Sequence, residues 1–353
     1  GLGRMGLKSI IYFEIVTTLA LVVGLVVVNV VQPGAGVQLA GDPGTIGAIA
    51  QHHPKTLTET IVHIFPTSII DAMAKGDVLQ IVTFAVLFAL ALNRIGEKSA
   101  TIVAWCESLA QTMFAFTNLI MKFAPIGIGA AMAATIGHQG LSILTYLGLL
   151  IASLYGALIL FVVFVLGAVM VIARVPLRPF IKAIREPFTL AFVTTSSESA
   201  LPMAMERMEL FGVPKRIVSF VMPAGYTFNL DGTTLYLSMA SVFVMQALST
   251  TVPGFTFGIG QQITMMLALM ITSKGVAAVP RASLVILLAT LASFLPANMA
   301  HYAPIAVAMI FGVDEFMDMA RTSVNLLGNC LATVVVARWE GQFDDEKARG
   351  FGQ

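Results

Sequence analysis

Five polar side chains near the C-terminus recur at a spacing that places them on one face of a helix. They are separated by 4, 3, 4 and 4 residues within the mostly apolar residues 301–337. The five are Asp314, Asp318, Arg321, Asn325 and Asn329. Ionisable groups in an apolar segment are costly and usually mark the path of a substrate or an ion. A carboxylate at 318 less than one turn from a guanidinium at 321 could hold a zwitterion that carries an extra carboxylate, so the stripe predicts an amino-acid transporter. The alternative is a buried salt bridge that only fixes helix packing.

Two further polar motifs interrupt apolar stretches. Residues 229–233 read NLDGT, where an unwound backbone would expose carbonyl oxygens to a cation and Asp231 would add charge. The alternative there is a glycine kink with Asp231 facing water. Residues 196–199 read SSES, and a helix that begins at this point would attract a carboxylate. Glu198 within it is a candidate proton carrier, or else a side chain that lines an entrance or forms a salt bridge.

The composition is that of a polytopic membrane protein. Of 353 residues, 57% are hydrophobic and 11% charged, with a mean hydropathy of +0.88, whereas soluble domains have about 25% charged residues. The net charge of +1 gives no electrostatic reason to expect nucleic-acid binding. Spanning segments are predicted at residues 10–31, 57–92, 101–136, 141–173, 217–248 and 303–337. The run at 101–136 should break at its Pro-Ile-Gly sequence, and the run at 217–248 near its proline and glycines.

Residues 180–211 and 262–295 do not fit simple spans. Each has two apolar pieces of roughly 10–14 residues around a polar tip, against the ~20 residues that a bilayer needs. Half-length helices around a polar tip are typical of re-entrant hairpins, which persist at membrane depth only inside protein or beside a water-filled cavity. Two such units, each followed by a longer span, predict inverted structural repeats.

Lysine and arginine predict the orientation of the chain. The loops near residues 32–55, 137–141, 250–260 and 296–300 contain a single basic residue, Lys55, whereas the loops on the other side contain many. The positive-inside rule makes the basic side, including the C-terminus, cytoplasmic. The first hairpin would then enter from the cytoplasm and the second from outside.

Four motifs give the chain a resemblance to a known family. They are TTSSESALP at residues 194–202, NLDGT at 229–233, SKGVAAVPRAS at 273–283 and DMARTSVNLLGN at 318–329. The motifs lie, in this order, on the first predicted hairpin, the broken span, the second hairpin and the last span. In this arrangement they resemble the dicarboxylate/amino acid:cation symporter family, the bacterial relatives of glutamate transporters. The resemblance extends over essentially the whole chain.

The resemblance implies an all-α polytopic membrane protein with glutamate-transporter-like inverted repeats and two re-entrant helical hairpins, at about residues 178–212 and 262–296. The family has eight spanning helices, and the first two are expected to be absent from this chain. A discontinuous transport domain, residues 1–32 and 140–337, would move past a trimerisation scaffold at 54–137, with residues 338–353 as a cytoplasmic tail. The protein is thus expected to be a homotrimer surrounded by lipid in a bacterial inner membrane.

The family's binding residues carry over position by position. Arg321 would bind the side-chain carboxylate of the substrate with help from Thr233, and Asp318 and Thr322 would bind its α-amino group. Three further groups would hold the α-carboxylate: Asn325, Ser197 and the backbone of Val279. Family members that move C4-dicarboxylates lack an aspartate at position 318, so the resemblance favours glutamate or aspartate. The tip with Glu198 looks more like the C4-dicarboxylate members, which leaves a succinate, fumarate or malate symporter as the alternative.

The coupling ion is predicted from substitutions at family positions. Sodium-coupled members have aspartate at position 329 and threonine at position 16, where this chain has Asn329 and Val16. Bacterial proton/glutamate symporters also have asparagine at 329, so proton coupling is favoured, with Glu198 as the carrier and no organic cofactor. The alternative is sodium coupling, with weak ligands at Asn229, Asp231, Asn325 and Asn329.

Two activities of other classes are alternatives. An intramembrane aspartyl protease would use Asp231 and Asp318, but Arg321 would ion-pair with one carboxylate and hold it ionised. Asp231 also precedes its glycine, unlike the GxGD pattern of those enzymes. An anion channel is conceivable, and a large current uncoupled from substrate flux would support it. We therefore predict a transporter and not an enzyme.

Overall fold

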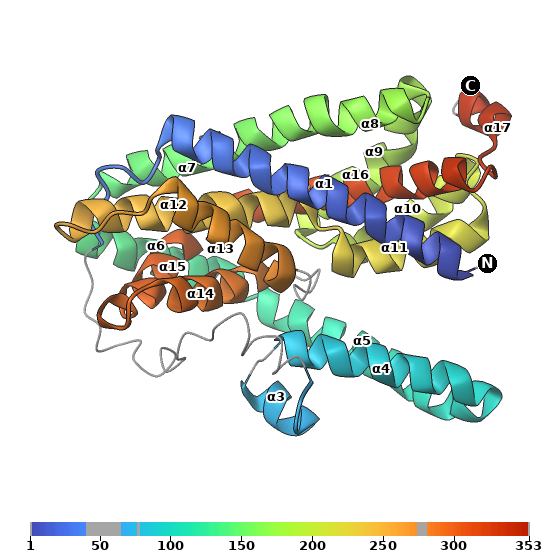
Figure 1. Ribbon diagram of the computed structural model, residues 1–353, viewed down its shortest axis with the longest axis horizontal. Coiled ribbons are helices and arrows are strands. Elements are labelled where there is room, and N and C mark those ends of the chain that lie inside the picture. The colour runs from blue at the N-terminus through green and yellow to red at the C-terminus, as the bar shows by residue number, and fades with distance from the viewer. Residues whose placement is uncertain (1, 40–64, 76–77, 274–280, 352–353) are drawn as a thin grey trace. The chain divides into compact units, whose positions relative to one another are not determined.

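A computed structural model of the chain describes residues 2–39, 65–75, 78–273 and 281–351. The regular secondary structure in these ranges is entirely helical. The chain divides into two compact units, residues 1–52 with 135–353 and residues 53–134 (Figure 1). Three described helical segments are long and apolar enough to cross a membrane: Gly3–Val31, Ile143–Ile172 and Asp314–Trp339.

The smaller unit contains α3 (Ile69–Lys75), α4 (Val78–Ile95), α5 (Ala100–Met121) and most of α6 (Ala124–Gln139). We expected the run at 101–136 to break at its Pro-Ile-Gly sequence, but the structure ends α5 at Met121 and begins α6 at Ala124. The proline therefore lies in the first turn of α6, where its missing N–H leaves no hydrogen bond unmade.

Three long helices pack together in the larger unit: α1 (Leu2–Val31), α12 (Asp231–Thr251) and α16 (Asp314–Trp339). α1 packs along α12, and α12 packs on α16 (Figure 1). Helix α16 is buried along most of its length, although it carries five polar stripe residues. The continuous segment α7 (Ile143–Leu160), π-helix Phe161–Leu166 and α8 (Gly167–Ile172) instead exposes many apolar side chains, as a lipid-facing helix does.

Two predicted spans are each divided into two helices. The run at 217–248 breaks at Asn229 and Leu230, between α11 (Lys215–Phe228) and α12, whereas Pro223 and Gly225 lie inside α11. The run at 303–337 was expected to be one helix, but it is α15 (Tyr302–Phe311) followed by α16. The interruption at Gly312–Val313 makes Asp314 the first residue of α16, so the whole polar stripe still lies on one helix.

Helix pairs occupy both regions where hairpins were expected. The first pair is α9 (Leu177–Thr194) with α10 (Ser197–Leu210), and the second is α13 (Ile259–Thr272) with α14 (Ala282–Phe294). α9 has 18 residues, which exceeds the expected half-length. Thr195 has a left-handed φ of 50°, which turns the chain between α9 and α10. Re-entry of the pairs into a membrane stays a prediction, and residues 274–280, including Val279, lie outside the described residues.

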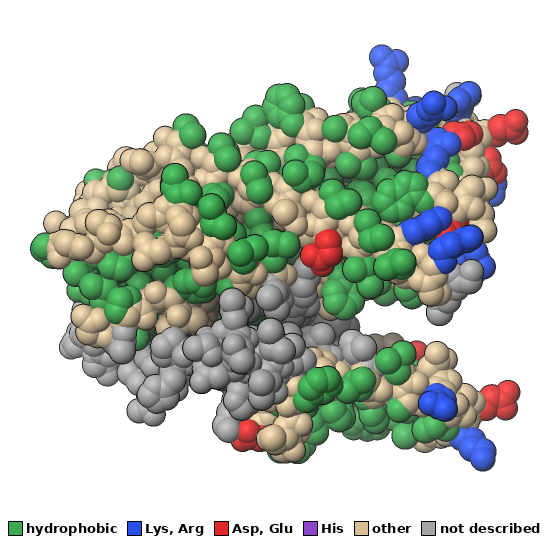
Figure 2. Space-filling view, in the orientation of Figure 1, with side chains coloured by type: hydrophobic (Ala, Val, Ile, Leu, Met, Phe, Trp, Pro, Cys, Tyr) green, Lys and Arg blue, Asp and Glu red, His purple; other side chains and the backbone are tan. Residues whose placement is uncertain are grey.

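One end of the larger unit is rich in charge. On the face shown in Figure 2, its lysine and arginine side chains gather at the end where α1 begins and α17 (Asp345–Gly350) lies. There Glu340 forms ion pairs with Arg4 and Lys8, both at 2.7 Å. Arg338 donates to both oxygens of Asp345, at 2.6 and 2.7 Å, and these bonds lower the pKa of Asp345 below its usual value. The segment after α16 is therefore tied to the ends of α1 and α16.

Candidate functional site

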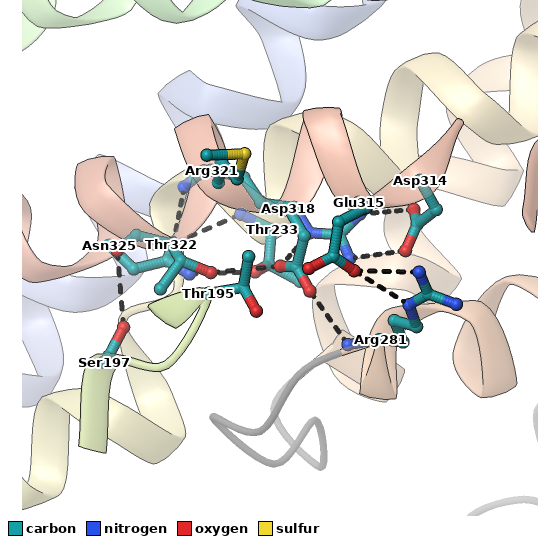
Figure 3. A network of polar contacts seen from close by, with 12 residues as sticks. Thr195, Ser197, Thr233, Arg281, Asp314, Glu315, Asp318, Arg321, Thr322 and Asn325 are labelled. Carbon is teal, nitrogen blue, oxygen red and sulfur yellow. Dashed lines mark hydrogen bonds and ion pairs between the residues drawn. The ribbon is translucent and has the colours of Figure 1, made fainter. Parts of the chain in front are cut away.

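The polar stripe of α16 is buried. The exposed fractions are 0% for Asp314, 4% for Asp318, 1% for Arg321, 3% for Asn325 and 0% for Asn329. Burial of ionisable groups is unfavourable unless they are paired and hydrogen-bonded. Each of the five has a hydrogen-bond partner. Some partners lie on α16 itself, others are the backbone of Arg281 and the start of α12 (Figure 3), and Asn329 pairs with Asn229.

Arg321 is held by two carboxylates and an aromatic ring. Its Nη1 and Nη2 donate to the two oxygens of Asp314 at 2.9 and 3.1 Å, and its Nε donates to Asp318 Oδ1 at 2.8 Å. Its guanidinium carbon lies 4.1 Å from the ring centre of Tyr236 on α12, a cation–π contact. These contacts use three of the five N–H donors of an arginine side chain. Counting only contacts with described residues, N–H donors remain for a further carboxylate.

Asp318 links α16 to the second helix pair. Its Oδ1 accepts from Arg321 Nε and from Thr322 Oγ1, the latter at 3.0 Å. Its Oδ2 accepts from the backbone N–H of Arg281, the residue before α14, at 2.9 Å. An ionised carboxylate has about four acceptor positions. Three are filled by these bonds, so, within the part of the chain that the structure describes, Oδ2 retains room for one more donor.

A second arginine–carboxylate pair adjoins the first. Arg281 donates from Nε and Nη2 to Glu315 Oε2, at 3.1 and 2.8 Å, and its guanidinium carbon lies 4.5 Å from the ring centre of Phe311. Glu315 is three residues before Asp318 on α16. Together the contacts in Figure 3 join three carboxylates to two guanidiniums, which leaves one formal negative charge. A ligand ammonium would offset that charge.

Asn325 joins the stripe to the break between α11 and α12. Its Oδ1 accepts from the N–H groups of Gly232 and Thr233 at 2.8 and 3.2 Å. Its Nδ2 donates to Thr233 Oγ1 at 2.9 Å. The first N–H groups of α12 have no partner within their own helix, and Asn325 satisfies two of them from the neighbouring helix.

A cluster of amides and a carboxylate lies one turn further along α16. Asn229 Nδ2 donates to Asn329 Oδ1 at 3.1 Å and to Asp231 Oδ2 at 3.3 Å, and all three residues are fully buried. Within the described residues, Asn229 Oδ1 has no hydrogen-bond partner. Buried oxygens of this kind suit a hard cation such as Na⁺. Three of the four predicted sodium ligands are therefore together, and Asn325 lies one turn away on α16.

Glycines allow the broken helix to approach α16 closely. The three glycines concerned are Gly225, Gly232 and Gly328. A Cβ at each would overlap, in this order, Asn329 Oδ1, the backbone oxygen of Arg321 and Asp231 Oδ2. No side chain fits at these positions without displacing an atom of the site.

The tip of the first helix pair reaches the stripe through Ser197. Its Oγ donates to the backbone oxygen of Thr322 at 3.3 Å, and its side chain is 1% exposed. Ser196 caps α10 by accepting from the N–H of Ser199 at 3.3 Å. Glu198 is half-buried in the first turn of α10, and its Oε2 is a buried atom that has no hydrogen-bond partner among the described residues.

Several residues of this network have no binding role predicted from the sequence. Asp314 was recognised as part of the stripe, and its position seven residues before Arg321 was a usable signal, because two helical turns separate the two side chains. Glu315 and Tyr236 have no such signal. Glu315 is next to Asp314 in the sequence and does not follow the spacing of the stripe, and Tyr236 lies on a different helix. Val279 lies outside the described residues.

Comparison with known proteins supports the motifs. The profile of the sodium:dicarboxylate symporter family matches residues 1–339. The chain is 42% identical over 358 residues to the proton/sodium-glutamate symport protein of Geobacillus stearothermophilus, and 44% identical over 352 residues to that of Bacillus subtilis (strain 168). A third relative with this name, from Bacillus caldotenax, is 41% identical over 358 residues. These alignments cover 98–99% of this chain and 79–82% of the relatives.

The resemblance drawn from the four motifs is thereby confirmed, and so is the prediction of a transporter instead of an enzyme. The spanning helices and the buried charged stripe agree with a multi-pass membrane protein. The chain belongs to the sodium:dicarboxylate symporter family of membrane transporters.

Proposed function

We propose that the chain is a secondary active symporter for an acidic amino acid, glutamate or aspartate. The observation that carries the proposal is the buried network in which Asp318 and Arg321 lie one turn apart and in which, among the described residues, three carboxylates meet two guanidiniums. An acidic amino acid brings an ammonium for Asp318 and a carboxylate for the remaining donors of Arg321. The names of the three relatives, all glutamate symport proteins, support this substrate class.

In this proposal separate residues of the network bind the three charged groups of the substrate. Arg321 and Thr233 bind the side-chain carboxylate, and Asp318 with Thr322 Oγ1 binds the ammonium. Three further groups receive the α-carboxylate: Asn325, Ser197 and the backbone of Val279. Ser197 Oγ is already within hydrogen-bond distance of the backbone of Thr322, which supports a role at this end.

A C4-dicarboxylate such as succinate, fumarate or malate is the second candidate. The sequence of the first tip, with Glu198, favours it. The charge of the network argues against it, because a substrate without an ammonium would add two negative charges beside three carboxylates and two guanidiniums.

For coupling we propose H⁺, with Glu198 as the carrier. The orphaned, buried Oε2 of Glu198 at the tip of the first helix pair supports a site that binds and releases a proton. Na⁺ is the alternative, supported by the buried oxygens of Asn229, Asp231 and Asn329. The relatives are named for both ions.

Movement of the substrate would follow an elevator-type alternating-access mechanism. Residues 1–32 and 140–337 form the proposed transport domain, and residues 54–137 form the proposed scaffold of a homotrimer in a bacterial inner membrane. The two helix pairs would act as re-entrant hairpins that reach the site from opposite sides. The segment 338–353 would be a cytoplasmic tail, in agreement with the basic end of the larger unit.

Uptake into proteoliposomes tests the proposal. With an imposed proton gradient and no sodium, we expect accumulation of radiolabelled glutamate or aspartate that excess succinate does not block. Uptake that requires a sodium gradient would refute proton coupling and support the cluster at Asn229. Uptake of succinate in preference to both amino acids would refute the proposed substrate.

Glu198→Gln tests whether the carboxyl group of Glu198 carries the coupled proton. The substitution keeps the size of the side chain but removes the group that binds a proton. We expect proton-driven accumulation to fall at least about tenfold, while exchange of internal for external glutamate continues. The isosteric Glu186→Gln on α9 is the control. Proton-driven accumulation by the Glu198 variant at the wild-type level would exclude this carboxyl group as the carrier.

A further inference from the structure

We propose that Arg281 and Glu315 are positioning residues that orient Asp318 toward the ammonium of the substrate. This inference rests on the proposed acidic amino-acid site and adds two residues to it, neither of which touches the substrate. The structural feature behind it is the junction of α14 with α16, where one residue makes both a side-chain and a backbone contact with the same helix (Figure 3).

The side chain of Arg281 is anchored on two helices. Nε and Nη2 both donate to Glu315 Oε2, and the guanidinium lies over the ring of Phe311 on α15. Its side chain is only 12% exposed, against 27% for that of Glu315. A largely buried guanidinium requires a carboxylate partner, so Glu315 fixes where this arginine lies.

The backbone of Arg281 is in a conformation that the anchor must maintain. Its φ of 63° is left-handed, which is unfavourable for a residue with a Cβ. Such conformations persist where surrounding contacts determine them. Here the ion pair on one side of the residue and the N–H···Oδ2 bond on the other hold the first turn of α14 against α16.

The consequence for Asp318 is a defined orientation. Arg321 and Thr322 hold Oδ1 from within α16, but the only described donor to Oδ2 is the N–H of Arg281. That bond fixes the direction of the acceptor position that Oδ2 retains. An ammonium needs that acceptor, whereas a carboxylate does not. The pair should therefore affect recognition of the amine and leave recognition of the carboxylates unchanged.

Glu315→Gln tests the inference in the full chain in proteoliposomes. We expect the KM for glutamate to rise about tenfold, the loss associated with one hydrogen bond to a charged group, with the maximal rate within about twofold. Inhibition by glutarate, which is glutamate without the amine, should change by less than about twofold. Equal changes for both ligands, or no change in the glutamate KM, would overturn the inference.

A double-mutant cycle distinguishes loss of the Arg281–Glu315 ion pair from unrelated effects of each substitution on the protein. Arg281→Gln should raise the KM as Glu315→Gln does, and the double variant should be no worse than either, because both remove the same anchor. Additive effects would overturn the inference. Arg281→Lys keeps the charge and should recover part of the affinity. Glu186→Gln, which breaks the Arg207–Glu186 pair between α9 and α10, is the matched control and should leave the KM unchanged.

Failure of the inference can be distinguished from failure of the proposed function. Wild-type protein that takes up no acidic amino acid under either ion gradient would refute both. Wild-type uptake together with an unchanged glutamate KM in Glu315→Gln would refute the positioning role alone. Wild-type uptake together with a selective loss for glutamate over glutarate supports both.

Discussion

Arg321→Lys is expected to reduce kcat/KM for glutamate at least about 100-fold, while the protein still folds. Lysine keeps the positive charge between Asp314 and Asp318, so no buried carboxylate is left without a countercharge. Its single ammonium cannot reproduce the fork that reaches both oxygens of Asp314 and one of Asp318 while leaving N–H groups for a ligand. The contact of the guanidinium with the ring of Tyr236 is lost as well.

The measurement is initial-rate uptake over a range of glutamate concentrations, with thermal unfolding in detergent as a check on folding. Arg207→Lys is the matched control, because Arg207 pairs with Glu186 at a more exposed position, where such a pair contributes at most about 1 kcal/mol. Wild-type kcat/KM in the Arg321 variant would mean that the buried salt bridge only fixes helix packing.

Asp318→Asn is expected to remove the preference for an amine-bearing substrate. The change removes the negative charge that balances the ammonium, and it places an amide where Oδ2 now accepts from the N–H of Arg281. We expect the apparent affinity for glutamate to fall about 100-fold, equivalent to about 3 kcal/mol. The affinity for glutarate should stay the same or improve, since one negative charge has left the site.

Asp314→Asn provides the comparison for this experiment. Both aspartates bond to Arg321 and both substitutions remove one charge, but only Asp318 is proposed to contact the amine. Competition of labelled glutamate uptake by glutamate and by glutarate gives the ratio of affinities for each variant. An equal change of that ratio in the two variants would contradict the assignment of Asp318 to the amine.

Much of the site could be predicted from the sequence because its main contacts lie on one helix. The spacing from Asp314 to Asn329 determines that these side chains share a face, whatever surrounds the helix. The NLDGT motif likewise indicated a break, and the structure has one at Asn229 and Leu230. Glycine and polar residues within an apolar run indicate a break locally, so the break can be recognised from a single sequence.

Contacts between helices could not be predicted in the same way. Nothing in the spacing of Arg281 indicates that its backbone N–H meets Asp318, or that its side chain meets Glu315, 34 residues further on. The side chain of Arg281 is moreover largely buried, which the sequence of the second hairpin does not reveal. The break at Gly312–Val313 was missed as well, because an apolar run of this length fits one helix as well as two.

The close approach of the glycines to α16 has a mechanical consequence. The atoms against which the glycines pack are also the polar atoms of the site: Asn329 Oδ1, the backbone oxygen of Arg321 and Asp231 Oδ2. Separation of α12 from α16 would therefore break the hydrogen bonds of Asn325, and separation of the α11–α12 break from α16 would break the bond between Asn229 and Asn329. Any conformational change that preserves the site must carry these three helices together as one rigid body, and deformation has to occur in the segments that join them to the rest of the chain.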